Sequence, residues 1–150
     1  MTPTIPQLCA SFDSHSVKYV LIGGAAVNLH GFNRFTDDID VLIEATVENA
    51  QAVIEALRDL GLGTAWLIEG EGLLEKPITV FKDVVQIDIQ VQTRGISFPE
   101  AWERRETMIV DGQRLCFLTI QDLIASKEAA GRPQDLEDLE WLRRFQRGEL

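Results

Sequence analysis

The most restrictive feature of the sequence is residues 84–92 (VVQIDIQVQ), in which apolar and polar side chains alternate. Because successive side chains of a strand point to opposite faces, this alternation predicts a β-strand with one core face and one polar face. Asp88 is the only acidic residue on the polar face, where its neighbours are glutamines. The chain must therefore fold around a sheet that can carry a carboxylate on its polar side.

A second acidic segment, residues 34–43 (RFTDDIDVLI), opens another predicted strand. Asp38 and Asp40 are two residues apart, so they point to the same face with Cα atoms about 7 Å apart. Ile39, Val41 and Ile43 take the opposite face. Two carboxylates are thus attached to a strand whose other side is apolar, a placement that solubility alone does not require.

The order of predicted elements defines the fold class. A buried strand in 17–24 ends at two glycines, a short helix follows to Gly31, and the acidic strand leads to a helix that begins at Thr46 and ends at Gly61. Residues 64–68 are assigned a strand, residues 77–81 and 84–92 form a hairpin around Lys82 and Asp83, and Asp111-Gly112 predicts a second hairpin. Helices are predicted from Thr119 to about Ala130 and over 136–145. The fold class is α/β or α+β, with a mixed sheet flanked by helices and two helices at the C-terminal end.

Length and composition set further limits. A chain of 150 residues with 45% hydrophobic residues predicts one globular domain, residues 1–150. No apolar run approaches the roughly 20 residues that span a bilayer, and the first residues lack a signal-peptide pattern, so we expect a cytoplasmic protein with no membrane partner. The net charge of -10 argues against a generally basic surface for nucleic acid but leaves room for a local basic patch. Cys9 and Cys116 have neither zinc-ligand nor disulfide-framework spacing.

The acidic residues suggest metal chemistry. Two carboxylates on one side of a rigid strand repel each other unless a cation lies between them, and hard oxygen ligands suit Mg²⁺ or Mn²⁺. A third carboxylate from a neighbouring strand would complete a two-metal site, and Asp88 is the natural candidate. Asp38, Asp40 and Asp88 are therefore the candidate metal ligands and catalytic residues.

The two glycines suggest phosphate binding. Gly23 and Gly24 place backbone N–H groups between a buried strand and the start of a helix, where unpaired donors and partial positive charge favour phosphate. Each feature alone has an ordinary structural explanation, as a turn, a solvated strand end or a surface residue. Their order along the chain favours a single site, in which a triphosphate at the glycines and metals at the aspartates support phosphoryl transfer.

That order, with GG after a strand, then a helix, then DID and a later IDI, resembles the nucleotidyltransferase fold of the DNA polymerase β superfamily. Residues 21–43 (LIGGAAVNLHGFNRFTDDIDVLI) look most like small prokaryotic nucleotidyltransferases related to abortive-infection toxins of toxin–antitoxin systems. The resemblance implies metal binding by Asp38, Asp40 and Asp88. It also implies nucleotide binding by a second set of residues, namely Gly23, Gly24, Arg34, Thr36 and Lys127.

The same resemblance implies an activity and its partners. The enzyme would use Mg²⁺ to move NMP from an NTP to a hydroxyl of RNA (such as tRNA), of a protein or of a small molecule. A cognate antitoxin or other regulatory protein is an expected partner. The alternative is a catalytically inactive protein of this fold that serves as a regulatory or binding partner.

Two further alternatives concern Lys127 and the glycine turn. Lys127 lies on the inward stripe of its helix, so its ammonium needs a negative partner, which could be triphosphate or else Asp135 or Asp138 of the next helix. A Rossmann-type dinucleotide site fits poorly, because GGAAVNLHG lacks the G-x-G-x-x-G spacing and the acidic residues open the second strand instead of closing it.

Overall fold

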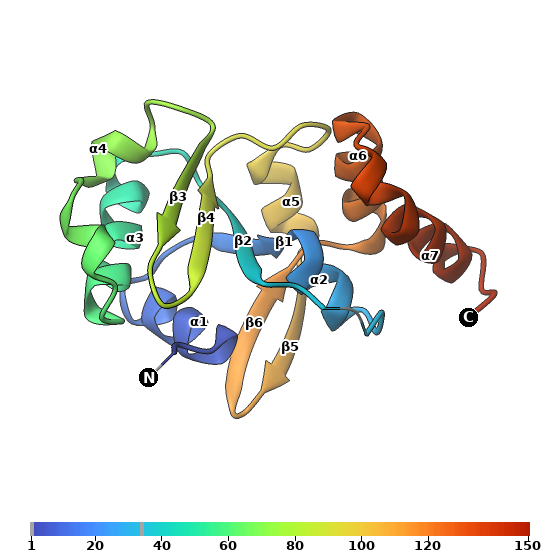
Figure 1. The fold of residues 1–150 in the computed structure, drawn as a ribbon, viewed down its shortest axis with the longest axis horizontal. Coiled ribbons are helices and arrows are strands. Elements are labelled where there is room, and N and C mark those ends of the chain that lie inside the picture. Colours follow the sequence, from blue (N-terminus) through green and yellow to red (C-terminus); the bar gives the residue numbers. More distant parts are fainter. Residues whose placement is uncertain (1, 34) are drawn as a thin grey trace.

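A computed structural model describes residues 2–33 and 35–150 (Figure 1). The helices are α1 (Ile5–Ser14), α2 (Gly23–Leu29), α3 (Val47–Asp59), α4 (Gly70–Leu73), α5 (Phe98–Arg104), α6 (Ile120–Ala130) and α7 (Leu136–Gln146), with 3-10 turns η1 (Gly63–Trp66) and η2 (Pro133–Asp135). The strands are β1 (Tyr19–Ile22), β2 (Asp38–Ile43), β3 (Ile78–Lys82), β4 (Gln86–Gln90), β5 (Glu106–Val110) and β6 (Gln113–Phe117).

The strands form one mixed sheet. Its order is β3-β4-β2-β1-β6-β5. Strand β2 pairs with β4 in parallel and with β1 in antiparallel orientation, β1 pairs with β6 in parallel, and the two hairpins β3–β4 and β5–β6 are antiparallel. The mixed α/β architecture with two C-terminal helices is therefore confirmed.

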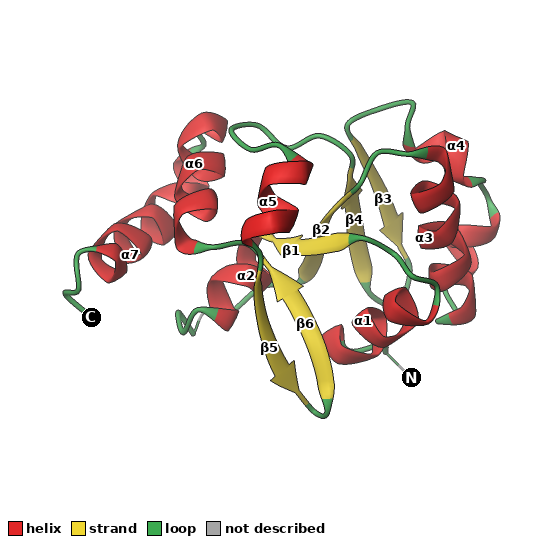
Figure 2. Cartoon of the chain, turned by 180° about the vertical axis from the view of Figure 1, so that it is seen from behind, coloured by secondary structure: helices red, strands yellow, loops and turns green. Residues whose placement is uncertain are grey.

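Of the seven helices among the described residues, five lie at the two ends of the sheet. Figures 1 and 2, which view the chain from opposite sides, both place α1, α3 and α4 together at one end and α6 and α7 at the other. The buried apolar side chains of the sheet and the helices form one contiguous core that includes Val41, Ile43, Ile87 and Ile89. In the described part of the chain, no helix combines the length and apolar character needed to cross a membrane.

Local signals placed most helix ends correctly. The Thr46 side chain accepts a hydrogen bond from Asn49 N, and Thr119 accepts one from Asp122 N, so both are N-caps as predicted. Gly131 ends α6 in the left-handed conformation with φ 62°. The Asp111-Gly112 turn joins β5 to β6, and both of its residues have positive φ.

The strand predicted over residues 64–68 is wrong. The segment forms η1 and then leads into α4. Its carbonyl groups are bonded by a side chain instead of a neighbouring strand, because the Arg58 guanidinium donates to Ala65 O at 3.0 Å and to Ile68 O at 2.9 Å. Three helices, α1, α4 and α5, were not predicted; α1 begins with a capping box of Thr4 and Gln7, and α5 has a proline in its first turn.

The Asn49 side chain connects α3 to the residue before β1 and the residue after β2, where β1 begins and β2 ends. Its amide oxygen accepts from Lys18 N at 2.8 Å, and its amide nitrogen donates to Lys18 O and Glu44 O, both at 3.0 Å. The side chain is only 7% exposed. Because Asn49 sits in the first turn of α3, it fixes this helix against the strand pair that carries the acidic motif.

Replacing Asn49 by Leu should therefore destabilise the fold. Three partly buried backbone groups would lose their partner, and we expect the free energy of unfolding to fall by about 3 kcal/mol. Glu48→Ala, an exposed change in the same helical turn, should cost less than about 1 kcal/mol. Urea unfolding followed by circular dichroism measures both variants, and equal losses would contradict the role assigned to Asn49.

Candidate active site

The pairing of β2 with β4 brings the three predicted carboxylates together. Asp40 lies directly opposite Asp88 in this parallel pair, and Asp38 is opposite Gln86. Carboxylate oxygens of Asp38, Asp40 and Asp88 all lie within 4.8 Å of one another. Gln86 Nε2 donates to Asp88 Oδ1 at 3.1 Å and so restrains the rotation of that carboxylate. Sequence reasoning had treated Gln86 as part of a polar strand face and had missed this contact.

The glycine turn packs directly on the acidic cluster. Ile22, the last residue of β1, is opposite Asp40, and Gly23 follows with φ +61°. A Cβ atom at Gly23 would lie 2.4 Å from Asp40 Oδ2. Any larger residue would therefore displace that carboxylate, and glycine also tolerates the left-handed backbone.

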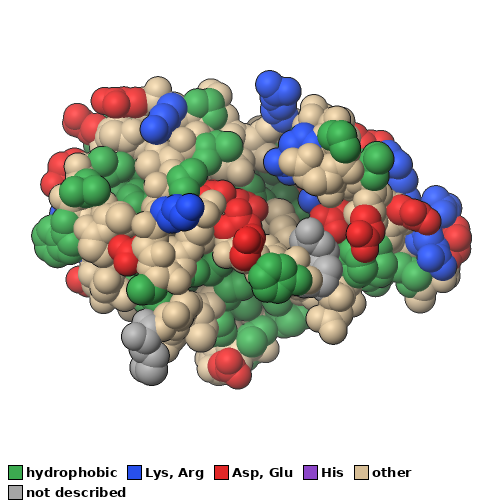
Figure 3. Space-filling model, in the orientation of Figure 1, with side chains coloured by type: hydrophobic (Ala, Val, Ile, Leu, Met, Phe, Trp, Pro, Cys, Tyr) green, Lys and Arg blue, Asp and Glu red, His purple; other side chains and the backbone are tan. Residues whose placement is uncertain are grey.

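A cavity of about 740 Å³ surrounds these groups. Gly23, Gly24, Thr36 and the three carboxylates line it on the sheet side, and residues from the β4–α5 loop, α6, η2 and α7 line it opposite, including Arg94, Lys127, Arg132, Asp135 and Asp138. Figure 3 shows acidic side chains gathered at the hollow between the β3–β4 hairpin and the C-terminal helices, with basic side chains across it. The cavity has the mixed charge of a site for a metal-bound anion.

Burial and the close approach of the carboxylates raise the pKa values of Asp40 and Asp38. Burial, followed by the charge of Asp38 and contact with Asp88, raises the pKa of Asp40 from 3.8 to about 7. Burial and then the charges of Asp88 and Asp37 also raise the pKa of Asp38. The negative form of the cluster is thus disfavoured by the protein alone, and a divalent cation would relieve that cost.

Lys127 lies in the same cavity and has protein partners. Its ammonium contacts Asp135 Oδ1 at 3.1 Å and Asp138 Oδ2 at 3.0 Å, and the residue is 7% exposed. Of the two predicted partners, the aspartates are the ones that the structure shows, Asp135 from η2 and Asp138 from α7. The lysine also lines the cavity that contains Asp40.

Arg132 binds the same carboxylate as Lys127. Its Nε donates to Asp135 Oδ2 at 2.8 Å and its Nη2 to Asp135 Oδ1 at 3.1 Å. Burial alone would raise the pKa of Asp135, but bonds and charges from Arg132 and Lys127 hold it below its usual value. We call Lys127, Arg132, Asp135 and Asp138 the C-terminal ion cluster.

The remaining predicted residues have different positions. Thr36 lines the cavity, and its hydroxyl donates to Asp38 O at 3.1 Å, so it shapes the start of β2. Gly24 lies in the first turn of α2 and lines the cavity. Arg34 lies outside the described residues. Arg94, which lines the cavity from the loop after β4, was missed because a single arginine beyond a strand carries no sequence signal.

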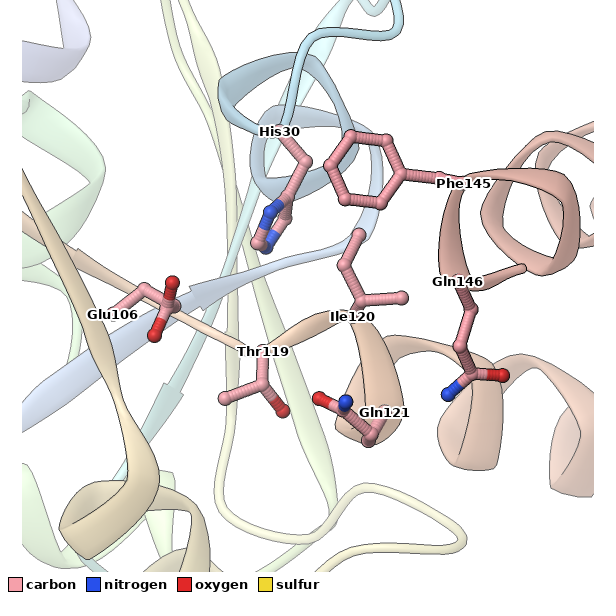
Figure 4. Close-up of a pocket in the computed structure, with 7 residues that line it drawn as sticks. All are labelled: His30, Glu106, Thr119, Ile120, Gln121, Phe145 and Gln146. Atoms are coloured by element: carbon pink, nitrogen blue, oxygen red, sulfur yellow. The ribbon is translucent and has the colours of Figure 1, made fainter. Parts of the chain in front are cut away.

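A second cavity, of about 450 Å³, lies apart from the acidic cluster (Figure 4). His30, Glu106, Thr119 and Phe145 are among its lining residues. His30 Nε2 is 2.7 Å from Leu118 O, so the imidazole already has a backbone partner. Of its lining residues Glu106 alone carries a carboxylate, so this cavity lacks the grouped ligands of the first.

The carboxylate cluster on adjacent strands beside a glycine turn is the site that the sequence resemblance leads us to expect in a nucleotidyltransferase. The family described as "Nucleotidyltransferase of unknown function (DUF6036)" matches residues 5–143, so the chain belongs to that family of enzymes. The expectation of a nucleotidyltransferase is confirmed at the level of this family. No curated protein sequence matches the chain significantly.

Solved structures support the same fold. The Thermotoga maritima protein TM1012, provisionally assigned as a nucleotidyltransferase, aligns with a TM-score of 0.56 at 12% identity, over 95% of this chain and 89% of its own. An antigenic nucleotidyltransferase-like protein from Paracoccidioides brasiliensis aligns with a TM-score of 0.57 at 15% identity, over 92% and 72%. ANT(2'')-Ia, solved with adenylyl-2''-tobramycin, aligns with a TM-score of 0.54 at 15% identity, over 96% and 95%.

The raised pKa of Asp40 predicts how stability changes with pH in metal-free protein. Since the pKa is about 7 in the folded state and 3.8 ordinarily, the stabilisation by protonated Asp40 is complete below pH 3.8 and disappears as pH rises through 7. Asp40→Asn should therefore stabilise the chelator-treated protein at pH 8, by on the order of 2 kcal/mol, and not at pH 4. Thermal unfolding at both pH values, with the exposed change Glu75→Gln as control, tests this; an Asn variant no more stable at pH 8 would refute it.

Loss of a buried cation from the C-terminal ion cluster should lower the free energy of unfolding more than loss of an exposed one. Lys127→Met removes the buried cation that two carboxylates share and should cost about 3 kcal/mol. Arg143→Met removes an exposed pair, Arg143 to Glu128 at 2.7 Å, and should cost less than about 1 kcal/mol. Chemical unfolding at pH 7 compares the two, and similar small losses would mean that Lys127 is not held as described.

Proposed function

We propose that the protein is an active nucleotidyltransferase that uses Mg²⁺, or Mn²⁺, to transfer NMP from an NTP to a hydroxyl group. The observation that carries the proposal is the meeting of Asp38, Asp40 and Asp88 within 4.8 Å beside the Gly23 turn. We also propose that residues 1–150 form one domain and that it acts in the cytoplasm.

The donor set fits a hard divalent cation. Three carboxylates supply oxygen ligands only, and two of them have pKa values raised by burial and mutual charge. Asp38, Asp40 and Asp88 would hold the metal. When bound, Mg²⁺ would offset the charge of the phosphates and polarise the reacting phosphoryl group.

The position of each protein group then suggests its role in the reaction. Backbone N–H groups of the Gly23–Gly24 turn would bind the triphosphate, and the close contact of Gly23 with Asp40 brings that triphosphate up to the carboxylates. Lys127 would add positive charge from α6. Asp88, held by Gln86, would accept the proton of the attacking hydroxyl.

The reaction balances with these groups. The acceptor oxygen forms a bond to the α-phosphorus, the bond from that phosphorus to the β-phosphate oxygen breaks, and pyrophosphate leaves. The hydroxyl proton passes to Asp88. We propose an acceptor of tRNA, protein or small-molecule type and a toxin–antitoxin role with a cognate partner; the resemblance of residues 21–43 to abortive-infection nucleotidyltransferases supports this role.

The alternative is an inactive protein of the same fold that regulates or binds a partner. The acidic face would then serve protein contacts, and its chemistry would be dispensable. A triple change of Asp38, Asp40 and Asp88 to Asn that retains partner binding and cellular phenotype would favour this alternative.

Labelled NTPs with Mg²⁺ and cell extract test the activity directly. Wild-type protein should transfer label to an extract component, and Asp88→Asn should lower the rate by roughly 100-fold or more, because it removes both a metal ligand and the proton acceptor. Glu75→Gln should leave the rate unchanged. Absence of Mg²⁺-dependent NTP binding by calorimetry in the wild type would refute the proposal.

A further inference from the structure

The cations that line the cavity are not equivalent. Among the described lining residues they are Arg94, Lys127 and Arg132. Lys127 and Arg132 each form ion pairs within the C-terminal ion cluster, which holds two cations and two carboxylates. Arg94 is exposed and forms no ion pair with any residue that the structure describes. Among the described lining residues, Arg94 is therefore the cation without a carboxylate partner.

The backbone of Arg94 is nevertheless held in place from both sides. On one side, Thr93 Oγ1 donates to Gln90 Oε1 at 2.6 Å, and Thr93 forms a bridge with Ile96. On the other side, Gly95 rests on α6, where a Cβ atom would lie 2.5 Å from Ala125 O and 2.9 Å from Ala129 Cβ. With φ +85°, Gly95 is also in the left-handed region. The loop thus presents Arg94 to the cavity from a fixed position.

The sheet topology places Arg94 and the glycine turn on opposite sides of the metal ligands. Ile22, Asp40 and Asp88 form one row across β1, β2 and β4. Strand β1 is antiparallel to β2 and continues from that row into Gly23, whereas β4 is parallel to β2 and continues in the other direction. Gln90, at the end of β4, already lies about 7 Å beyond Asp88, and the loop that carries Arg94 leaves the sheet from that end of the strand.

This arrangement decides which substrate Arg94 meets. In the proposed reaction the α-phosphate of the NTP lies at the carboxylates and its other phosphates extend toward Gly23, so the charged part of the donor lies on the far side from Arg94. The nucleoside itself carries no charge. An anion beside Arg94 must then belong to the acceptor.

We infer that Arg94 is a specificity-determining residue, which binds an oxyanionic group such as a phosphate on the hydroxyl acceptor. The planar guanidinium offers paired N–H donors that match the oxygens of such a group. The inference rests on the proposed nucleotidyltransfer and adds to it the chemical class of the acceptor.

Kinetics of Arg94→Gln in the labelled-transfer assay test this inference. The variant should bind Mg²⁺ and NTP with an unchanged Kd by calorimetry, while kcat/KM for the acceptor in extract falls roughly 10-fold to 100-fold. Arg94→Lys should recover part of that loss. At saturating NTP, added inorganic phosphate should inhibit the wild type in competition with the acceptor and should inhibit Arg94→Gln much less.

Two further variants separate charge from position. Gly95→Ala keeps the charge but must shift the loop on α6, so it should also lower acceptor kcat/KM at constant NTP affinity. Arg114→Gln removes an equal charge from an exposed position of β6 that does not line the cavity, and it should leave both acceptor kcat/KM and NTP affinity unchanged.

The outcomes are distinct from those of the proposed function. If wild-type protein binds no NTP with Mg²⁺, nucleotidyltransfer fails and this inference fails with it. If the wild type is active and Arg94→Gln instead weakens NTP binding, or leaves acceptor kcat/KM unchanged, the inference alone is overturned.

Discussion

The parallel pairing of β2 with β4 is the constraint on which the site depends. It places Asp40 opposite Asp88, and it is locked by apolar residues on the other face, Ile39 and Val41 in β2 with Ile87 and Ile89 in β4. A slip of one residue would turn the carboxylates into the core and the isoleucines outward. Hydrophobic burial therefore supplies the free energy that holds three mutually repelling carboxylates together.

The charged side chains of the cavity fall into two sets, one with paired cations and carboxylates and one that is purely acidic. The C-terminal ion cluster pairs Lys127 and Arg132 with two aspartates, whereas the three carboxylates on the sheet form no ion pair with any residue that the structure describes. Burial and the neighbouring carboxylates raise the pKa of Asp40, and a bound cation would stabilise the ionised form. The cavity is thus organised to receive a metal together with the phosphates that the metal neutralises.

Sequence periodicity predicted the parts of this site that depend on a strand's alternating faces. Asp38, Asp40 and Asp88 were identified because each alternates with core-facing apolar residues along its strand, and Gly23 because a strand ends there. The adjacency of β2 and β4 came from the family resemblance, since no local signal encodes strand order. The roles of Arg94 and Asn49 depend on contacts between segments that are distant in the sequence, whereas the pairing of Lys127 with Asp135 and Asp138 was one of its two predicted options. Helix α5 has only seven residues, too few for a helical period to be recognised. Helix α1 does carry a signal that was overlooked, because Leu8 and Phe12 are four residues apart and follow the capping box of Thr4 and Gln7.

The central claim is that the three carboxylates bind divalent metal beside a bound triphosphate. A crystal structure of the protein with Mn²⁺ and a nonhydrolysable NTP, with anomalous scattering used to locate the manganese, tests it most directly. We predict manganese bound by Asp38, Asp40 and Asp88, with the polyphosphate on the Gly23–Gly24 turn. Manganese found elsewhere, or a nucleotide bound away from that turn, would contradict the account.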